Sequence, residues 1–210
     1  MKFDGIILDV DGTIWNTTQI VAEAWNKAIK ENFPEIQPVT AEILKGQFGK
    51  TIDVIGKNLF GVLGDSDRDK LLKMCCEAEQ LAINENQKDI AYEGVISSIK
   101  ELSKTIPLFI VSNCQSGYIE LVMKKNGITE FITDFECFGD TGRPKDENIS
   151  LIVKRNNLKK PVYVGDTQGD FEACKKAGVP FIWAAYGFGR PETQDYYGKL
   201  DRFADLKNLL

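Results

Sequence analysis

The sequence predicts an α/β fold, in which a parallel sheet with helices on both faces is interrupted early by an all-helical segment. Short apolar runs typical of buried strands recur along the chain, and amphipathic helical segments separate them. Most of these runs end in polar or acidic residues, as strands do at the binding edge of an open α/β sheet. The exception to this alternation is residues 16–88, which show helical periodicity only.

The first predicted strand comprises the branched apolar residues from Ile6 and ends at two acids, Asp9 and Asp11. Gly12 allows a sharp turn directly afterwards, and Thr13 offers a hydroxyl and a backbone N–H. This pattern suits a ligand site, but Asp-Gly is also a common turn pair. The rest of the chain decides between the two interpretations.

Four helices are predicted in the segment after this loop. Thr17 or Thr18 caps the first, Thr40 opens the second, and Ser66 caps a long fourth helix. The apolar face of that fourth helix is predicted to comprise Leu71, Leu72, Cys75, Ala78, Leu81 and Ala82. Trp15 and Trp25 are expected to pack within this insert rather than to contact a ligand.

Strands and helices alternate again after the insert. The predicted elements are a helix at 94–104, a strand at 107–111, a helix from Ser116 to Gly127, a strand at 135–138, a helix at 147–156, a strand at 161–164, a helix ending at Gly178, a last clear strand at 179–184 and a terminal helix at 204–210. We therefore divide the chain into an α/β core, residues 1–15 and 89–210, and a helical insert, residues 16–88.

Polar side chains follow nearly every predicted strand of the core, and right-handed crossovers would bring them to one edge of the sheet. They are Asp9, Asp11, Ser112, Asn113, Lys145, Asp166 and Asp170. Two negative charges about 4 Å apart cost roughly 4 kcal/mol at an effective dielectric constant near 20. A cation with oxygen ligands offsets this cost, and Mg²⁺ accepts carboxylates, waters and phosphate oxygens. Lysine, hydroxyl and backbone donors around such a metal favour binding of a phosphoryl group.

A calcium loop is the competing metal site. Such a loop needs acids at alternate positions along twelve residues, with glycine in the sixth position. Gly12 comes too early after Asp9 for this, and an apolar strand precedes it, so the calcium loop is rejected.

The composition excludes several function classes. The 210 residues include no histidine, which rules out Ser-His-Asp and Cys-His catalysis and every imidazole metal site. A net charge of −5 without a basic cluster argues against a nucleic-acid partner. The sequence has no apolar run of membrane-spanning length and no signal-peptide pattern, so no membrane association is expected. Five cysteines without CxxC spacing suit idle thiols in a reducing cytoplasm.

Four motifs in order carry a family resemblance over almost the whole length. They are LDVDGT at 8–13, VSN at 111–113, the lysine segment at 143–146 and GDTQGD at 165–170. With these motifs the chain resembles the haloacid dehalogenase-like phosphohydrolases, in the branch of phosphoglycolate phosphatase and β-phosphoglucomutase. Tyr92–Val95 and Ala185–Gly189 also resemble segments of that branch.

The resemblance implies a Rossmann-like core with a helical-bundle cap, and a role for each motif residue. Asp9 would attack phosphorus and form an aspartyl-phosphate, and Asp11 would protonate the leaving oxygen and then activate water. Mg²⁺ would be held by Asp9, the Asp11 carbonyl, Asp166 and Asp170, the last directly or through water. Ser112 and Lys145 would hold the phosphoryl oxygens.

Two departures from the family pattern stand out. Asn16 replaces the aspartate of many members, and the lysine motif here runs Arg143-Pro144-Lys145-Asp146, so that either Arg143 or Lys145 is the phosphate-contacting cation. Lys145 is preferred because it directly precedes a predicted helix. The loop at 46–51 resembles the cap loop that faces the substrate, which makes Lys50 a candidate for specificity, although a solvated lysine is the simpler interpretation.

These observations predict a cytoplasmic, Mg²⁺-dependent phosphatase of a small phosphorylated metabolite, either monomer or homodimer. A phosphosugar mutase with the same aspartyl-phosphate is the alternative. A receiver-type signalling module, which also surrounds Mg²⁺ with aspartate, lysine and a hydroxyl, fits less well. Its phosphorylated aspartate lies in mid-chain, and it needs no helical insert.

Overall fold

The computed structural model describes residues 2–210, which form two compact units. The core unit comprises the chain up to Asn16 together with Ala91–Leu210, and the insert unit comprises Thr17–Ile90. The predicted division after residues 15 and 88 lies within two residues of these bounds. No helix in residues 2–210 has both the length and the apolar character needed to cross a membrane.

The core unit is built on a six-stranded sheet with the order β3-β2-β1-β4-β5-β6. The strands are β1 (Gly5–Leu8), β2 (Leu108–Ser112), β3 (Asp134–Cys137), β4 (Pro161–Gly165), β5 (Phe181–Ala184) and β6 (Gly198–Leu200). Every neighbouring pair is parallel, so the predicted parallel sheet is confirmed. The chain runs outward from β1 to β3 and then crosses back to β4, so the strand order reverses between β1 and β4. Ligands of open α/β sheets bind at such a reversal.

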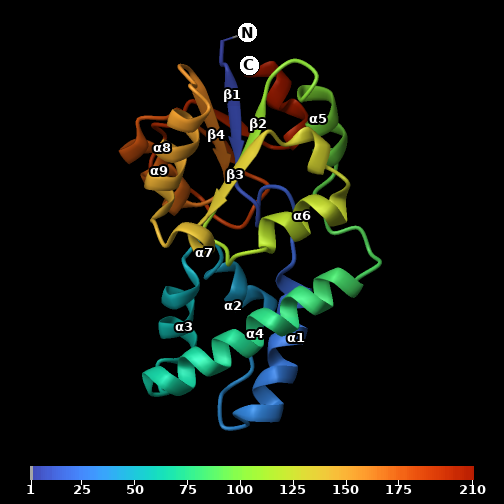
Figure 1. Ribbon diagram of the computed structural model, residues 1–210, viewed down its shortest axis with the longest axis vertical. Coiled ribbons are helices and arrows are strands. Elements are labelled where there is room, and N and C mark those ends of the chain that lie inside the picture. Colours follow the sequence, from blue (N-terminus) through green and yellow to red (C-terminus); the bar gives the residue numbers. More distant parts are fainter. Residues whose placement is uncertain (1) are drawn as a thin grey trace. The chain divides into compact units, whose positions relative to one another are not determined.

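Helices cover both faces of this sheet, as predicted. Figure 1 shows α5 (Val95–Leu102) and α6 (Tyr118–Asn126) on one side, and α8 (Lys145–Arg155) and α9 (Gln168–Ala177) on the other. The core under α8 and α9 includes Phe109, Ile149 and Phe181, all almost fully buried. The unit also contains α7 (Phe138–Thr141) and the 3₁₀ turns η1 (Thr129–Phe131) and η2 (Phe203–Asn208).

Several predicted element bounds in the core are wrong. Helix α6 is preceded by Gly117 in the left-handed conformation at φ 81°, so Ser116 does not cap it. Helix α8 begins two residues before the predicted start, at Lys145, and the predicted terminal helix at 204–210 is the 3₁₀ helix η2, Phe203–Asn208. Strand β6 escaped prediction because it has three residues, of which only Leu200 is buried.

The insert unit consists of α1 (Thr18–Asn32), α2 (Ala41–Lys45), α3 (Ile52–Phe60) and α4 (Asp65–Glu85), so the four predicted helices are present. Helices α1 and α4 pack against each other. The hydroxyl of Thr40 caps α2 by accepting a hydrogen bond of 3.2 Å from the Ile43 N–H. Thr17 precedes α1, but its side chain makes no capping bond.

The fourth helix differs from its prediction in its start and in its buried face. Ser66 lies inside α4, because the helix already begins at Asp65. Leu81 is 58% exposed, whereas Glu79 is buried and accepts a 2.6 Å hydrogen bond from the Trp25 indole. Trp25 therefore packs within the insert, as predicted.

Candidate active site

The loop after β1 provides the first two acids of the site. Strand β1 pairs with β2 at Leu8–Ile110 and with β4 at Leu8–Val164, so Asp9 emerges next to the ends of both neighbours. Asp9 is 1% exposed, and its N–H donates to the Val164 carbonyl at 2.9 Å. The backbone then turns sharply, because the Val10 carbonyl accepts a bond of 2.7 Å from the Ile14 N–H.

Glycine is required at two places where backbone closes on Asp166. Gly12 has φ 83°, and a Cβ atom there would lie 2.2 Å from Asp166 Oδ2. A Cβ atom on Gly187 would lie 2.4 Å from the Asp166 Cβ and 2.3 Å from the Gly12 carbonyl oxygen. Any side chain at Gly12 or Gly187 would therefore push Asp166 away from the site. The predicted turn at Gly12 is thus also a position of close approach.

Lys145 joins two of the acids. Its ammonium Nζ lies 2.8 Å from Asp9 Oδ1 and 2.6 Å from Asp170 Oδ1, and all three side chains are at most 4% exposed. Burial alone would lower the pKa of Lys145, but the charges of Asp170 and Asp9 outweigh it and raise that pKa above its usual value. Burial raises the pKa of Asp9 to about 6, although Lys145 opposes the rise. Arg143, the other candidate cation, is exposed.

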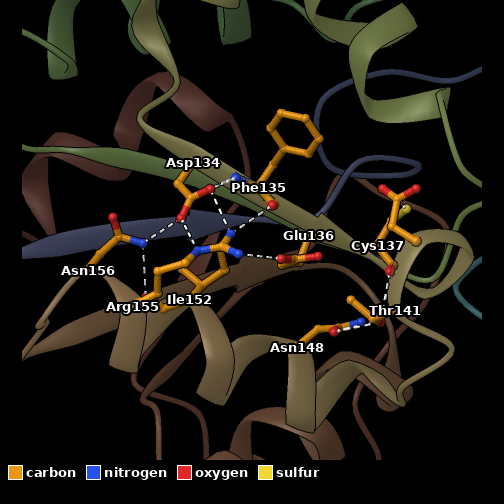
Figure 2. A network of polar contacts seen from close by, with 10 residues as sticks. Asp134, Phe135, Glu136, Cys137, Thr141, Asn148, Ile152, Arg155 and Asn156 are labelled. Carbon is orange, nitrogen blue, oxygen red and sulfur yellow. Dashed lines mark hydrogen bonds and ion pairs between the residues drawn. The ribbon is translucent and has the colours of Figure 1, made fainter.

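Polar contacts tie the loop before Lys145 to helix α8, and Figure 2 shows the one between Thr141 and Asn148. The Thr141 hydroxyl donates to Asn148 Oδ1 at 2.9 Å, and Asn148 Nδ2 donates to the Arg143 carbonyl at 3.1 Å. Asn148 is fully buried in this position. The loop that leads into α8 is therefore tied to the first turns of α8 itself, which holds Lys145 at the helix start.

Both carboxylate oxygens of Asp170 are hydrogen-bonded. Oδ1 accepts from Lys145 and, at 3.3 Å, from the Tyr163 hydroxyl, while Oδ2 accepts from the Thr167 N–H at 2.9 Å and hydroxyl at 2.6 Å. Thr167 in turn caps α9 by accepting from the Asp170 N–H, which completes a capping box. Burial would raise the pKa of Asp170, but Lys145 and Thr167 outweigh it and lower that pKa.

Asp166 has a different environment. It is fully buried, and its Oδ2 accepts from the Phe188 N–H at 2.6 Å and from the Gly189 N–H at 3.3 Å. Its Oδ1 has no hydrogen-bond partner among the described residues. Burial, and then repulsion from Asp170 and Asp9, raises the pKa of Asp166 well above its usual value. An ionised carboxylate in this place therefore needs a further positive charge.

The three buried acids meet the requirements of a metal site. One oxygen from each of Asp9, Asp166 and Asp170 lies within 4.8 Å of the others. If all three are ionised, Lys145 offsets only one of three negative charges. A divalent cation would supply the missing charge and a partner for Asp166 Oδ1, and oxygen-only ligands suit Mg²⁺. The residues present therefore fit the predicted metal.

The Asp11 carboxylate accepts hydrogen bonds from two aromatic side chains. Its Oδ1 accepts from the Tyr118 hydroxyl at 2.9 Å and from the Trp15 indole N–H at 3.1 Å. Trp15 belongs to the core unit and is fully buried there, so the prediction that it packs within the insert is wrong. The prediction failed because an aromatic residue next to a helical segment carries no signal of which unit buries it.

The remaining predicted residues of the core unit lie at the same edge of the sheet. Ser112 is buried at the end of β2 with Asn113 directly after it, and the fully buried Thr13 has no partner for its hydroxyl among the described residues. The Tyr186 hydroxyl donates to the Thr13 carbonyl at 2.8 Å. Lys50, the last predicted residue, belongs to the insert unit. There its Nζ donates to the Gly46 carbonyl at 2.8 Å and to Gln47 at 3.2 Å.

Sequence reasoning missed the groups that hold the acids in place. Tyr163 lies seven residues before Asp170, and Phe188 lies 22 residues after Asp166, so only the fold shows that these groups donate to the acids. Thr167 had a usable signal, since a threonine three residues before an acid at a helix start is typical of a capping box.

A family model for haloacid dehalogenase-like hydrolases matches residues 6–184. The chain therefore belongs to the haloacid dehalogenase-like hydrolases. The predicted resemblance to the phosphoglycolate phosphatase-like branch is confirmed, and the protein is an enzyme of the phosphatase type.

Relatives and solved structures agree with this assignment. The phosphoglycolate phosphatase of Agrobacterium fabrum is 24% identical over 192 residues, 87% of this chain and 80% of its own. The pyrophosphatase PpaX of Bacillus anthracis is 22% identical and aligns with 100% of this chain and 97% of its own. A predicted phosphoglycolate phosphatase from Haemophilus somnus shares the fold, with a TM-score of 0.87 at 19% identity, covering 100% and 98% of the two chains. CbbY from Rhodobacter sphaeroides, solved with phosphate, has a TM-score of 0.81 at 18% identity, covering 97% and 96%.

Proposed function

We propose that this enzyme is a Mg²⁺-dependent phosphatase that hydrolyses a small phosphorylated metabolite through an aspartyl-phosphate on Asp9. The observation that carries the proposal is the buried cluster of three carboxylates and one lysine at the reversal of strand order. Such a cluster is costly for stability, because burying charges demands full compensation. The relatives named phosphoglycolate phosphatase support phosphate-ester chemistry on a small substrate.

Asp9 is the proposed nucleophile, and Lys145 stabilises its ionised form. The Lys145 ammonium, 2.8 Å from Asp9 Oδ1, favours the ionised carboxylate that attack requires. Asp9 forms a bond to phosphorus while the bond from phosphorus to the leaving oxygen breaks. Ser112 and the N–H groups of the loop after β1 are proposed to bind the phosphoryl oxygens.

Asp11 is the proposed acid and base. It donates its proton to the leaving oxygen in the first step, and in the second it accepts a proton from the water that attacks phosphorus. This second step releases inorganic phosphate and restores the Asp9 carboxylate.

Mg²⁺, when bound, neutralises negative charge on the carboxylates and polarises the phosphoryl oxygens. We propose that Asp9, the Asp11 carbonyl and Asp166 hold it. Because the oxygens of Asp170 are already bonded to Lys145, Tyr163 and Thr167, Asp170 acts mainly through Lys145.

The insert unit is proposed to serve as a cap that excludes water from the aspartyl-phosphate, with Lys50 in the loop that selects the substrate. The mutase alternative shares the attack by Asp9 but returns the phosphoryl group to a sugar instead of to water. A panel of phosphorylated metabolites with Mg²⁺ separates the two, since a mutase releases little inorganic phosphate.

Trapping the phosphoenzyme tests the assignment of the nucleophile. Asp11→Asn should still accept a phosphoryl group from an acyl phosphate such as acetyl phosphate, but it lacks the base that activates water. Intact-mass spectrometry should therefore find a stable gain of one phosphoryl group, and peptide mapping should locate it on Asp9. Asp9→Asn is the matched control and should gain nothing. Mass addition at another residue, or on Asp9→Asn as well, would overturn the assignment.

A further inference from the structure

The side chain of Asp11 is held by two aromatic residues of its own unit. The Tyr118 hydroxyl and the Trp15 indole N–H reach the same oxygen, Oδ1, at 2.9 and 3.1 Å. An aspartate at the rim of a site otherwise has several side-chain rotamers available. Two donors that converge on one oxygen select a single orientation of the carboxyl group.

Neither donor can easily move. Trp15 is fully buried, and its carbonyl accepts from the Gly12 N–H at 3.0 Å, within the same turn that carries Asp11. Tyr118 is 2% exposed and lies in the first turn of α6. The two rings also pack edge to face, with centroids 5.7 Å apart at 73°. The two packed rings therefore hold both donors in fixed positions next to the Asp11 side chain.

A purely structural role is the simpler explanation. Buried N–H and O–H groups need acceptors, and Asp11 supplies one to each. However, both donors could be satisfied by backbone carbonyls, as Tyr186 is at the Thr13 carbonyl close by. Instead both bind the side chain that is proposed to transfer protons, and this transfer depends strongly on orientation.

We propose that Trp15 and Tyr118 are positioning residues that hold the Asp11 carboxyl in the orientation from which it passes a proton to the leaving oxygen. The inference rests on the proposed function, because it assumes that Asp11 is the acid. It adds that this acid is oriented by the core unit, through groups that touch neither substrate nor metal.

Leaving-group dependence distinguishes positioning from general damage. An alkyl phosphate needs a proton on its leaving oxygen, whereas an aryl phosphate releases a phenolate that needs little help. Loss of one donor should lower kcat for an alkyl phosphate by roughly 10- to 100-fold, since a displacement of about 1 Å can cost about 100-fold. Hydrolysis of an aryl phosphate should fall by much less, and KM should stay nearly constant for both.

The test uses Tyr118→Phe, which removes only the hydroxyl, and Trp15→Phe, which removes the N–H. Tyr186→Phe is the matched control, because it removes a part-buried hydroxyl that donates to the same loop, at the Thr13 carbonyl, and not to Asp11. Thermal unfolding of each variant reports folding. The ratio of alkyl to aryl activity should fall for Tyr118→Phe and Trp15→Phe and stay unchanged for Tyr186→Phe. Equal losses on both substrates in Tyr118→Phe would overturn the inference.

A double variant separates this inference from the proposed function. In an Asp11→Asn background, Tyr118→Phe should change the alkyl-to-aryl ratio no further, because the group it positions is gone. If Asp11→Asn itself leaves the ratio unchanged, the assignment of Asp11 as the acid fails. If Asp11→Asn lowers the ratio but neither aromatic variant does, or if Tyr118→Phe lowers it further in the double variant, only the positioning inference fails.

Discussion

The two ends of α8 carry the same kind of cluster in opposite surroundings. At its first residue, Lys145 binds Asp9 and Asp170, and all three side chains are nearly inaccessible. At its last residue, Arg155 binds Asp134 at 2.7 Å and Glu136 at 2.6 Å on strand β3 (Figure 2). The Arg155 side chain is 43% exposed.

The helix dipole favours one end and opposes the other. A cation at the C-terminus, such as Arg155, is stabilised by the dipole, whereas Lys145 lies at the positive end. Lys145 is held there by buried carboxylates despite the dipole. Water can solvate the net negative charge of the Arg155 cluster. It cannot do so for the buried Lys145 cluster, which has Asp166 beside it. Burial, rather than the number of ion pairs, thus distinguishes the end that belongs to the proposed catalytic cluster.

Removal of the metal should have the largest effect. EDTA treatment should reduce phosphatase activity to background, because Lys145 alone does not offset the charges of Asp9, Asp166 and Asp170, and Mg²⁺ should restore it. Ca²⁺ should not, since its looser coordination misplaces the nucleophile. Full activity in metal-free enzyme would contradict the view that the cluster at the Lys145 end of α8, unlike the Arg155 cluster, needs a metal cation to offset its charge. Thermal unfolding should show stabilisation by Mg²⁺ in the wild type but not in Asp166→Asn.

Substitution of the two cations compares the ends directly. Lys145→Met should lower kcat by roughly 100- to 1000-fold, as expected for loss of a charged group that stabilises the transition state. It should also destabilise the metal-free protein by about 3–5 kcal/mol, because two buried carboxylates lose their partner. Arg155→Met is the matched control on the same helix. Its activity should be unchanged and its loss of stability about 1 kcal/mol or less, because Arg155 is exposed and its partners Asp134 and Glu136 are only half-buried. Similar activity losses in both variants would contradict the comparison.

The pH dependence of stability should also differ between the clusters at the two ends of α8. Burial raises the pKa of Asp9 from 3.8 to about 6, so the folded protein binds a proton that the unfolded chain has released. Stability of the metal-free protein should therefore fall as pH rises from about 4 to 6, by up to about 3 kcal/mol from this group. Hydrogen bonds from Arg155 and Asn156 outweigh burial and lower the pKa of Asp134, so its contribution is lost only as pH falls below about 4.

Urea unfolding of EDTA-treated protein across this range measures the effect. Asp9→Asn should reduce the fall in stability between pH 4 and 6 and leave the contribution of Asp166, whose pKa burial also raises. Arg155→Met should leave the dependence as in the wild type. Stability that rises through this window in the wild type would contradict the assignment.

The smallest effect is expected at Lys50, an exposed cation in the insert unit. Its Nζ binds neutral oxygens of Gly46 and Gln47, so its charge is available to a substrate anion. Lys50→Gln should change relative kcat/KM among phosphorylated metabolites by up to about fivefold, equivalent to roughly 1 kcal/mol. Hydrolysis of a small aryl phosphate should change little. Lys57→Gln, which removes a lysine paired with Asp53 on α3, is the control. An identical preference profile for both variants would remove Lys50 from the specificity loop.

Local sequence determined the elements and the chemistry that each strand end carries. The apolar run before Asp9 has to be a buried strand, and acids that follow parallel strands have to meet at one edge, because the side-chain period and the right-handed crossover leave little choice. The absence of histidine left carboxylates, lysine and metal as the means of catalysis. Helix positions such as Thr40 followed from capping chemistry that needs only neighbouring residues.

Only the tertiary structure decided which side chains hold the acids and how. Tyr118 reaches Asp11 across 107 positions of sequence, and Lys145 reaches Asp9 across 136. Trp15 and Leu81 were assigned to the wrong surroundings, because burial depends on which element packs opposite. The choice between Arg143 and Lys145 for the carboxylate cluster likewise came from the fold. The two residues are only two positions apart, but Arg143 is exposed, whereas Lys145 is paired with Asp9 and Asp170. These three charges come together only because α8 packs against the sheet.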